Sequence, residues 1–228
     1  MSAVTVLSEG PVFHFDPVRM SALAIANRDS FASQDPFPHV VIDSFLPEYV
    51  LDQVLAELPA VPRGDGNDMS PTTATERGKT AHPEATFFGP QTTHLLYQLN
   101  SGDFLDFLEQ LTGIKDLISD MRLDGGGYHL TRRGGRLAIH TDFSHHRRWK
   151  IRRRLNLILY LNKDWKDEYG GHLELWDAAV TECKRRILQS VCNLRDRCRL
   201  SPRSTRTSDL PAGSRSSKPC PLLLRQPG

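Results

Sequence analysis

The sequence predicts an α+β protein in which helices come first and short strands follow. One helical pattern of apolar residues runs from Pro47 to Leu58, and a second runs from Ser101 to Thr112. From Asp120 onward, short apolar runs alternate with groups of glycines, which is typical of a β-sandwich or barrel. The helices are therefore expected to pack on a core built from strands.

Local signals set the expected limits of each element. Pro38–Phe45 is a β-branched run that predicts a strand, and Pro47 follows where a first helical turn tolerates proline. Ser101 is a candidate N-cap of the second helix, and Gly113 ends it. Residues 1–36 show no sustained period, and residues 63–80 predict a loop. Further strands are expected at residues 128–131, 137–140, 155–161 and 172–176.

The composition indicates one soluble domain with a tail. The chain has 228 residues, of which 25% are charged and 39% hydrophobic, and its net charge is +2. No apolar run is long enough to span a membrane, so a membrane protein is excluded. The N-terminal stretch lacks the basic start and apolar centre of a secretory signal, so we expect a cytoplasmic location.

The averages conceal a change of composition near residue 177. The 10 Phe, 5 Tyr and 3 Trp residues all lie at or before Trp176, and the 4 cysteines all follow it. From Ala178 onward, 11 Lys and Arg residues stand against three acids, so this segment is strongly basic. Few large apolar side chains remain to offset the entropy of ordering, so residues 189–228 are expected to be a disordered basic tail.

A histidine and a carboxylate two residues apart on a strand project from the same face and can hold two corners of an iron site. The sequence contains this spacing four times: His14/Asp16, His82/Glu84, His140/Asp142 and His172/Glu174. The first two pairs lie in stretches without strand rhythm and are interpreted as solvated loop residues. In the last pair, His172 is interpreted as a polar residue on a half-exposed strand face. The His140/Asp142 pair ends an apolar strand and is the best metal candidate.

The blocks around this pair resemble the core of the iron(II)/2-oxoglutarate dioxygenases, in the branch that is similar to prolyl 4-hydroxylases. They are Gly125–Gly135, His140–Phe143, Arg153–Asn162 and Tyr169–Asp177. The strand at Pro36–His39 and the helix after Pro47 also resemble that branch. The resemblance implies a double-stranded β-helix, or jelly roll, over residues 36–188, preceded by an N-terminal extension at residues 1–35.

The resemblance also implies a site and a reaction. His140 and Asp142 would be the first two iron ligands, a distal histidine the third, and an arginine after it would hold 2-oxoglutarate. Fe(2+) and 2-oxoglutarate are the implied cofactors, with ascorbate as a further one, and prolyl-type hydroxylation of a peptide is the nearest family activity. A small-molecule substrate stays open. No nucleic-acid or membrane partner is expected, and the oligomeric state cannot be read from the residues.

The distal histidine and the arginine are missing where the family has them. No histidine follows His172, and the basic tail stands in their place, so we expect an incomplete dioxygenase domain with impaired activity. We interpret the tail as translation in a shifted frame that begins between about Ile187 and Asn193. Suitable codons for these residues, when they are translated from one base later, encode sequences that are typical of the family. Pro202–Thr205 then permits His-Gly-Val-Pro, and Ser208–Arg215 permits Leu-Thr-Cys-Pro-Pro-Gly-Arg. Lys218–Leu224 permits Ser-Leu-Ala-Leu-Tyr-Tyr.

Three alternatives remain open at this point. The tail could be a natural disordered segment, although its cysteine spacing is unlike that of zinc modules and its arginines are discounted as a nucleic-acid patch. The domain could be a catalytically silent jelly-roll binding module. The basic residues after the His140/Asp142 pair, with His145 and His146, are interpreted as a solvated loop at the mouth of the site. They could instead steer an anionic substrate.

Overall fold

The computed structural model describes most of the chain between residues 12 and 226. The described residues are 12–58, 76–82, 88–120, 123, 127–140, 144–146, 149, 151–163, 166, 169–170, 172–177, 179–186, 191–196, 203–206, 216–219 and 221–226. Within these ranges, none of the helices is long and apolar enough to cross a membrane.

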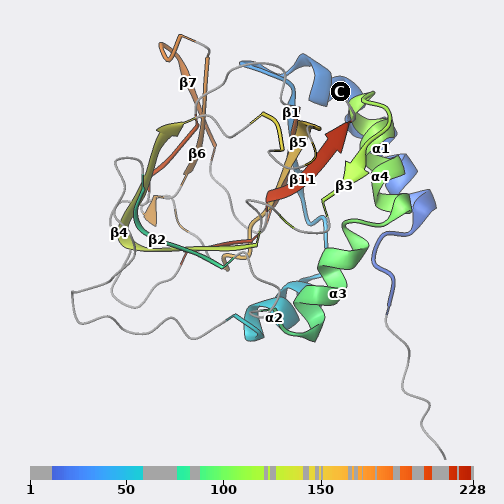
Figure 1. Ribbon diagram of the computed structural model, residues 1–228, viewed down its shortest axis with the longest axis horizontal. Coiled ribbons are helices and arrows are strands. Elements are labelled where there is room, and N and C mark those ends of the chain that lie inside the picture. Colours follow the sequence, from blue (N-terminus) through green and yellow to red (C-terminus); the bar gives the residue numbers. More distant parts are fainter. Residues whose placement is uncertain are drawn as a thin grey trace, which may run out of the picture.

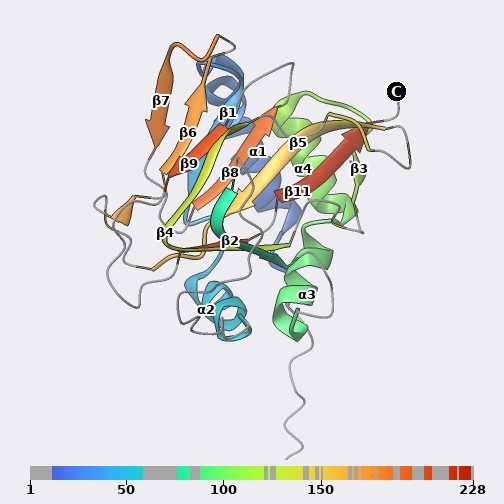
Figure 2. The ribbon, with the colours of Figure 1, turned by 60° about the vertical axis from the view of Figure 1, so that its left-hand side comes forward.

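The strands form two sheets (Figures 1 and 2). The first sheet has the order β1-β8-β5-β11-β3, with β1 at His39–Asp43, β8 at Val191–Asp196, β5 at Arg152–Leu159, β11 at Pro221–Gln226 and β3 at Ile118–Ser119. The second has the order β10-β4-β9-β6-β7, with β10 at Ser216–Pro219, β4 at Tyr128–His140, β9 at Arg203–Arg206, β6 at His172–Trp176 and β7 at Cys183–Arg186. Strand β2, at Glu76–His82, pairs with β4.

From β4 onward, the chain passes repeatedly from one sheet to the other. β4 lies in the second sheet, β5 in the first, β6 and β7 in the second, β8 in the first, β9 and β10 in the second, and β11 in the first. Every described pairing between these strands is antiparallel. This alternation brings segments that are far apart in the sequence next to one another, as in a two-sheet sandwich.

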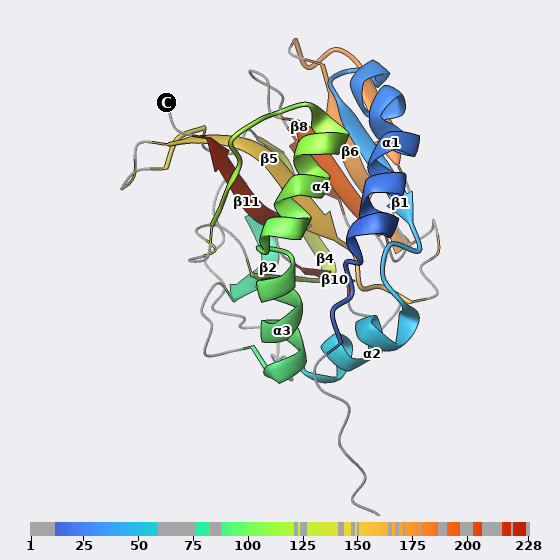
Figure 3. The ribbon, with the colours of Figure 1, turned by 90° about the vertical axis from the view of Figure 1, so that its right-hand side faces the viewer.

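The helices lie outside the first sheet. They are α1 at Pro17–Ser33, α2 at Glu48–Ala56, α3 at Pro90–Gln98 and α4 at Gly102–Thr112. Figure 3 shows α1 and α4 side by side over the face of the first sheet, with α2 and α3 towards one end. Phe15, Phe45, Phe104 and Phe107 fill the space between them, with ring centroids 4.8 to 6.2 Å apart. These rings and the β5 leucines, Leu155, Leu157 and Leu159, belong to one core cluster.

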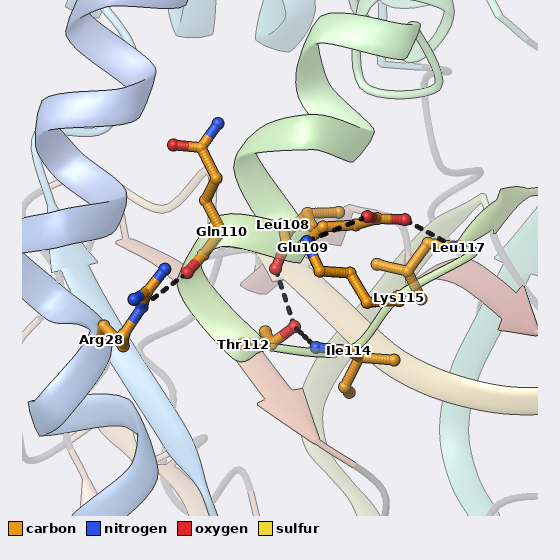
Figure 4. A network of polar contacts seen from close by, with 8 residues as sticks. All are labelled: Arg28, Leu108, Glu109, Gln110, Thr112, Ile114, Lys115 and Leu117. Carbon is orange, nitrogen blue, oxygen red and sulfur yellow. Dashed lines mark hydrogen bonds and ion pairs between the residues drawn. The ribbon is translucent and has the colours of Figure 1, made fainter.

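Polar contacts fix the end of α4 (Figure 4). The Thr112 hydroxyl donates to the Leu108 carbonyl at 2.7 Å and accepts from the Ile114 amide at 3.2 Å. The Glu109 carboxylate accepts from the Leu117 amide at 2.9 Å, which holds the chain that leads to β3. Gly113 ends the helix in the left-handed conformation at φ 75°, which glycine adopts without a steric penalty.

The expected helices and strands are largely confirmed where the signals are local. α2, α4, β1, β5 and β6 lie within three residues of their predicted limits, and Ser101 caps α4 by accepting from the Phe104 amide at 3.3 Å. The two strands predicted at residues 128–131 and 137–140 form a single strand, β4. Residues 76–80, predicted as loop, belong to β2, because their backbone groups pair with β4.

Two further segments differ from expectation. Residues 17–33, assigned to an N-terminal extension, form α1, and its Met20, Ala24 and Phe31 are buried in the main core. The segment 189–228, expected to be disordered, contributes β8, β9, β10 and β11. The expectation of disorder rested on side-chain composition, whereas a strand ladder is made by backbone N–H and C=O groups that every residue except proline carries in full.

Candidate metal site

His140 is the last residue of β4, and its ring is half-buried. Its Nδ1 lies 2.8 Å from the carbonyl oxygen of Ala138. A carbonyl can only accept, so Nδ1 carries the proton and donates it, and Nε2 is the nitrogen with the lone pair. Histidines that bind metals are commonly oriented in this way, by a hydrogen bond from the other ring nitrogen. Asp142, the second predicted ligand, lies outside the described residues.

Strand β9 runs beside His140. In the antiparallel register, His140 stands opposite Arg203, and Leu137 stands opposite Thr205. On its other edge, β9 pairs with β6, where Leu175 stands opposite Arg203 and His172 stands opposite Arg206. Residues 203–205, which belong to the segment that reads His-Gly-Val-Pro in the shifted frame, therefore lie next to the end of β4, whereas Pro202 lies outside the described residues.

The second strand-borne pair, His172 and Glu174, is held differently from expectation. His172 is only 4% exposed, so the interpretation of a half-exposed face is wrong for this residue. β6 lies inside the sheet between β9 and β7, which explains the burial. The Glu174 carboxylate accepts from the Trp176 indole nitrogen at 3.3 Å, so this carboxylate has a local structural partner on its own strand.

The first pair, His14 and Asp16, also has a structural role. Asp16 is the N-cap of α1, and its side chain accepts from the Arg19 amide at 2.8 Å. The His14 ring lies against Tyr49 and His94, with centroid distances of 6.2 and 6.0 Å. Burial, followed by repulsion from His94, lowers the pKa of His14. His14 is therefore packed against α2 and α3 and Asp16 caps α1, so the interpretation of this pair as solvated loop residues is wrong. Of the remaining pair, Glu84 lies outside the described residues.

The loop after the predicted ligands, His140 and Asp142, forms a hairpin with the start of β5. The His146 amide donates to the Ile151 carbonyl at 2.9 Å, and the Arg153 amide donates to the Ser144 carbonyl at 2.8 Å. The buried His146 ring is stacked on Trp149 at 4.5 Å, and its Nδ1 accepts from the Trp149 amide at 3.0 Å. His146 was expected in a solvated loop, and this is wrong because the stack and the hairpin cover its ring.

Arg153 likewise differs from its expected place in that loop. It is only 5% exposed, and its Nη2 donates to the Asn156 side-chain oxygen at 2.8 Å. A guanidinium that is desolvated and hydrogen-bonded to a buried amide orders the strand rather than attracting ligands from solvent. Arg147, Arg148 and Lys150 lie outside the described residues.

One cavity lies away from His140. It has a volume of about 480 Å³ and is lined by residues of α1, α2, the segment between β1 and α2, and the segment after β5. Its polar residues include Arg19, Glu48 and Lys163, and Lys163 forms ion pairs with Glu48, at 3.4 Å, and with Asp52. None of its lining residues belongs to β4, β9 or β6. No signal in the sequence predicts this cavity, because its walls come from four separate segments.

The residues that the structure describes do not complete an iron site. Among the described side chains, no group of three His, Cys, Asp or Glu residues could hold a metal ion. Opposite His140, the sequence supplies arginine, which has five donors and no acceptor and is therefore not a metal ligand. A site with two His and one carboxylate needs a third protein donor at this edge of β4.

Comparison with known proteins agrees with the motifs. Residues 126–206 match the family model described as the 2OG-Fe(II) oxygenase superfamily. The match contains His140 and Asp142 and ends at the last residue of β9, so residues 207–228 lie outside it. No curated protein matches the sequence.

Several solved structures with a similar fold are prolyl hydroxylases. A prolyl-4-hydroxylase from Pseudomonas putida is 19% identical with a TM-score of 0.60, and the match covers 90% of this chain and 100% of that one. A prolyl 4-hydroxylase from Phytophthora capsici is 16% identical with a TM-score of 0.59, and the match covers 97% of this chain and 69% of that one. A prolyl hydroxylase from Trichoplax adhaerens, in complex with a peptide fragment of hypoxia inducible factor, is 13% identical with a TM-score of 0.58. That match covers 91% and 90% of the two chains.

The resemblance indicated by the sequence motifs is thus confirmed. Over residues 126–206 the chain is similar to the 2OG-Fe(II) oxygenase superfamily, and its fold is similar to that of prolyl 4-hydroxylases. The description of the matching family names 2-oxoglutarate and iron(II), and a further solved structure with a similar fold, HygX from Streptomyces hygroscopicus, holds nickel and 2-oxoglutarate.

Proposed function

We propose that this chain is a form of an iron(II)- and 2-oxoglutarate-dependent hydroxylase whose activity is impaired by its C-terminal sequence. We further propose that its two sheets are the double-stranded β-helix of that family and that His140 and Asp142 are two of the iron ligands. The observation that carries the proposal is His140 itself. It ends a strand inside the matched segment, and its Nδ1 donates to a backbone carbonyl, which is the orientation common in histidines that bind metals.

The cofactors follow from the family. Iron(II) with 2-oxoglutarate supplies the oxidative chemistry in such enzymes, while the protein orients the substrate and excludes competing reactions. Ascorbate remains a further proposed cofactor. A peptidyl proline is the proposed substrate, because the hydroxylase from Trichoplax adhaerens is seen with a peptide. A cytoplasmic location remains a prediction from the N-terminal stretch.

A catalytically silent binding module is the second candidate function. The observation that favours it is the arginine opposite His140, because an arginine cannot replace a histidine ligand. This candidate predicts a folded protein that binds no stoichiometric iron and forms no succinate from 2-oxoglutarate. The impaired-enzyme proposal differs from it in predicting that a protein with the family's C-terminal sequence is active.

The test begins with the gene. Resequencing from codon 180 past the stop establishes whether a base is gained or lost near codon 190. The protein from the corrected frame is then assayed for iron-dependent succinate formation, and His140→Ala and Asp142→Ala are each expected to abolish it. His145→Ala is the matched control, because this exposed histidine lies on the same loop. Undiminished turnover in either ligand variant would refute the site assignment.

A further inference from the structure

The cavity beside α2 has an apolar wall and a charged edge. Its lining residues come from α1, α2 and the segments after β1 and β5, and none of them belongs to the strands around His140. Buried side chains of Leu46, Leu51 and Leu161 form the apolar part of the wall. The volume of about 480 Å³ lies within the range of about 300–1,000 Å³ that is usual for small-molecule sites.

Arg19 supplies a positive charge at this edge. It lies in the first turn of α1, at the end of that helix that lies towards α2 (Figure 3). Its Nη2 donates to the Phe45 carbonyl at 2.8 Å, and among the described residues no carboxylate accepts from its guanidinium. The neutral carbonyl orients the group without cancelling its charge. A guanidinium has five N–H donors in a planar fork that fits the two oxygens of a carboxylate, so most of the donors of Arg19 remain to bind one.

Lys163, the second cation that lines the cavity, is bound differently. Its Nζ forms ion pairs with Glu48, at 3.4 Å, and with Asp52. Two carboxylates around one ammonium make this part of the edge net negative. A ligand with a second carboxylate would be repelled by Glu48, whereas an aliphatic group would be favourable against the leucines. The charges therefore favour a ligand with one carboxylate over a dicarboxylate.

We propose that this cavity is a binding site for a small aliphatic monocarboxylate. Arg19 binds the carboxylate, and the aliphatic part lies against Leu46, Leu51 and Leu161. The inference does not depend on the proposed function, because no residue of the cavity belongs to the candidate metal site, and it can be tested without iron or 2-oxoglutarate.

The first experiment compares four probes with the full chain, by saturation-transfer NMR titration in the presence of a metal chelator. Hexanoate has one carboxylate, hexanamide is its neutral analogue, adipate carries a second carboxylate, and acetate lacks most of the aliphatic part. We expect hexanoate to bind most tightly. Hexanamide should bind about fivefold more weakly or worse, because a hydrogen bond to a charged group is stronger than one to a neutral group. Adipate should also bind more weakly, and acetate about tenfold more weakly or worse.

The second experiment places the site with single variants. Arg19→Gln should weaken hexanoate binding about tenfold, to the level of hexanamide. Arg28→Gln is the matched control, because Arg28 lies on the same helix and also donates to a backbone carbonyl, that of Gln110 at 2.9 Å, but does not line the cavity. It should bind hexanoate like the unchanged chain. Each variant is first checked for a cooperative thermal transition.

A gain of binding guards against a failure to fold. Glu48 is exposed, and Glu48→Gln removes the carboxylate that repels a second charge on the ligand. This variant should bind adipate about twofold more tightly or better than the unchanged chain, which a misfolded protein would not do. Its affinity for hexanamide should stay the same.

Four results would overturn the inference. They are no binding of hexanoate, equal affinities of the unchanged chain for hexanoate and hexanamide, equal hexanoate affinities of the folded Arg19→Gln and Arg28→Gln variants, and no gain of adipate binding in Glu48→Gln. None of these results bears on the proposed function, which is tested by succinate formation in the protein from the corrected frame.

Discussion

The helical side and the second sheet of this molecule are held together by different interactions. On the helical side, the buried rings of Phe15, Phe45 and Phe104 meet between α1, α4 and β1. Side-chain hydrogen bonds, such as that from Thr112 at the end of α4, fix the helix ends. In the centre of the second sheet, β9 is joined to β4 and β6 by its backbone ladder, and its own residues are polar or charged. Because of this difference, the stability of the fold and the chemistry of the site can be tested by separate substitutions.

The largest effect is expected from the aromatic cluster. Phe104 is fully buried at 0% exposure, with Phe15, Phe45 and Phe107 around it. Phe104→Ala removes these contacts and leaves a cavity, so it should lower the free energy of unfolding by about 3–5 kcal/mol. Urea denaturation followed by far-UV circular dichroism measures the change. Val18→Ala on the same side of the molecule is the control, because Val18 is 79% exposed and should change stability by less than about 0.5 kcal/mol. Similar losses in the two variants would contradict the comparison.

A smaller effect is expected where Glu57 caps α3. Its carboxylate accepts from the amides of Gln91 and Thr92 and from the Thr92 hydroxyl, each at 2.7 Å. The Thr92 hydroxyl is also hydrogen-bonded to the phenol of Tyr128, which links the cap to β4. Glu57→Ala should cost about 1–3 kcal/mol in urea denaturation, because the start of α3 loses its acceptor and the partly buried Thr92 loses a bond.

A substitution at Gly89 also tests whether Glu57 holds the start of α3. A Cβ at Gly89 would come within 2.3 Å of the Glu57 side chain, so Gly89→Ala should displace that carboxylate. The two substitutions should then fail to add, since each removes the same cap. In a double-mutant cycle, Gly89→Ala is expected to cost little in the Glu57→Ala background. Full additivity would show that Glu57 does not hold the start of α3.

The parts of this fold that could be predicted from the sequence are those with local signals. The cap at Ser101, the stop at Gly113 and the apolar run of β5 each mark an element within a few residues. α1 escaped prediction because its buried Met20 and Phe31 share the helix with the exposed Val18 and Ile25, so no clear apolar face is visible in the sequence.

The candidate metal site likewise has features that could be predicted from local signals and features that could not. The strand-end position of His140 could be predicted from the glycines and apolar residues that precede it. The residue opposite His140 could not, because strand pairing joins segments that are distant in the chain and its register depends on the whole sheet. The burial of His172 also depends on neighbouring strands rather than on the alternation within β6.

The smallest effect expected is a pH dependence on the helical side. Burial and the nearby His94 lower the pKa of His14, whose backbone amide donates to the Gln98 side chain at 2.6 Å. The folded state therefore binds a proton at His14 less readily than the unfolded chain, where the pKa is about 6.5. Stability should be unaffected by this group well above pH 6.5. It should fall as the pH drops through 6.5 towards the lower folded-state pKa, and level off below that.

Thermal unfolding between pH 5 and pH 8 measures this effect when the chain is compared with two single variants. His14→Gln should flatten the acid side of the profile, because the glutamine cannot be protonated, whereas His145→Gln at the exposed loop should leave the profile unchanged. Asp16, Tyr49 and His94 are the other titratable groups near His14, and all are retained in both variants. If His14→Gln and His145→Gln gave the same profile, the packing of His14 on α3 would not contribute to the acid sensitivity of the helical side. The difference between the helical side and the second sheet would then depend on the aromatic cluster and the Glu57 cap alone.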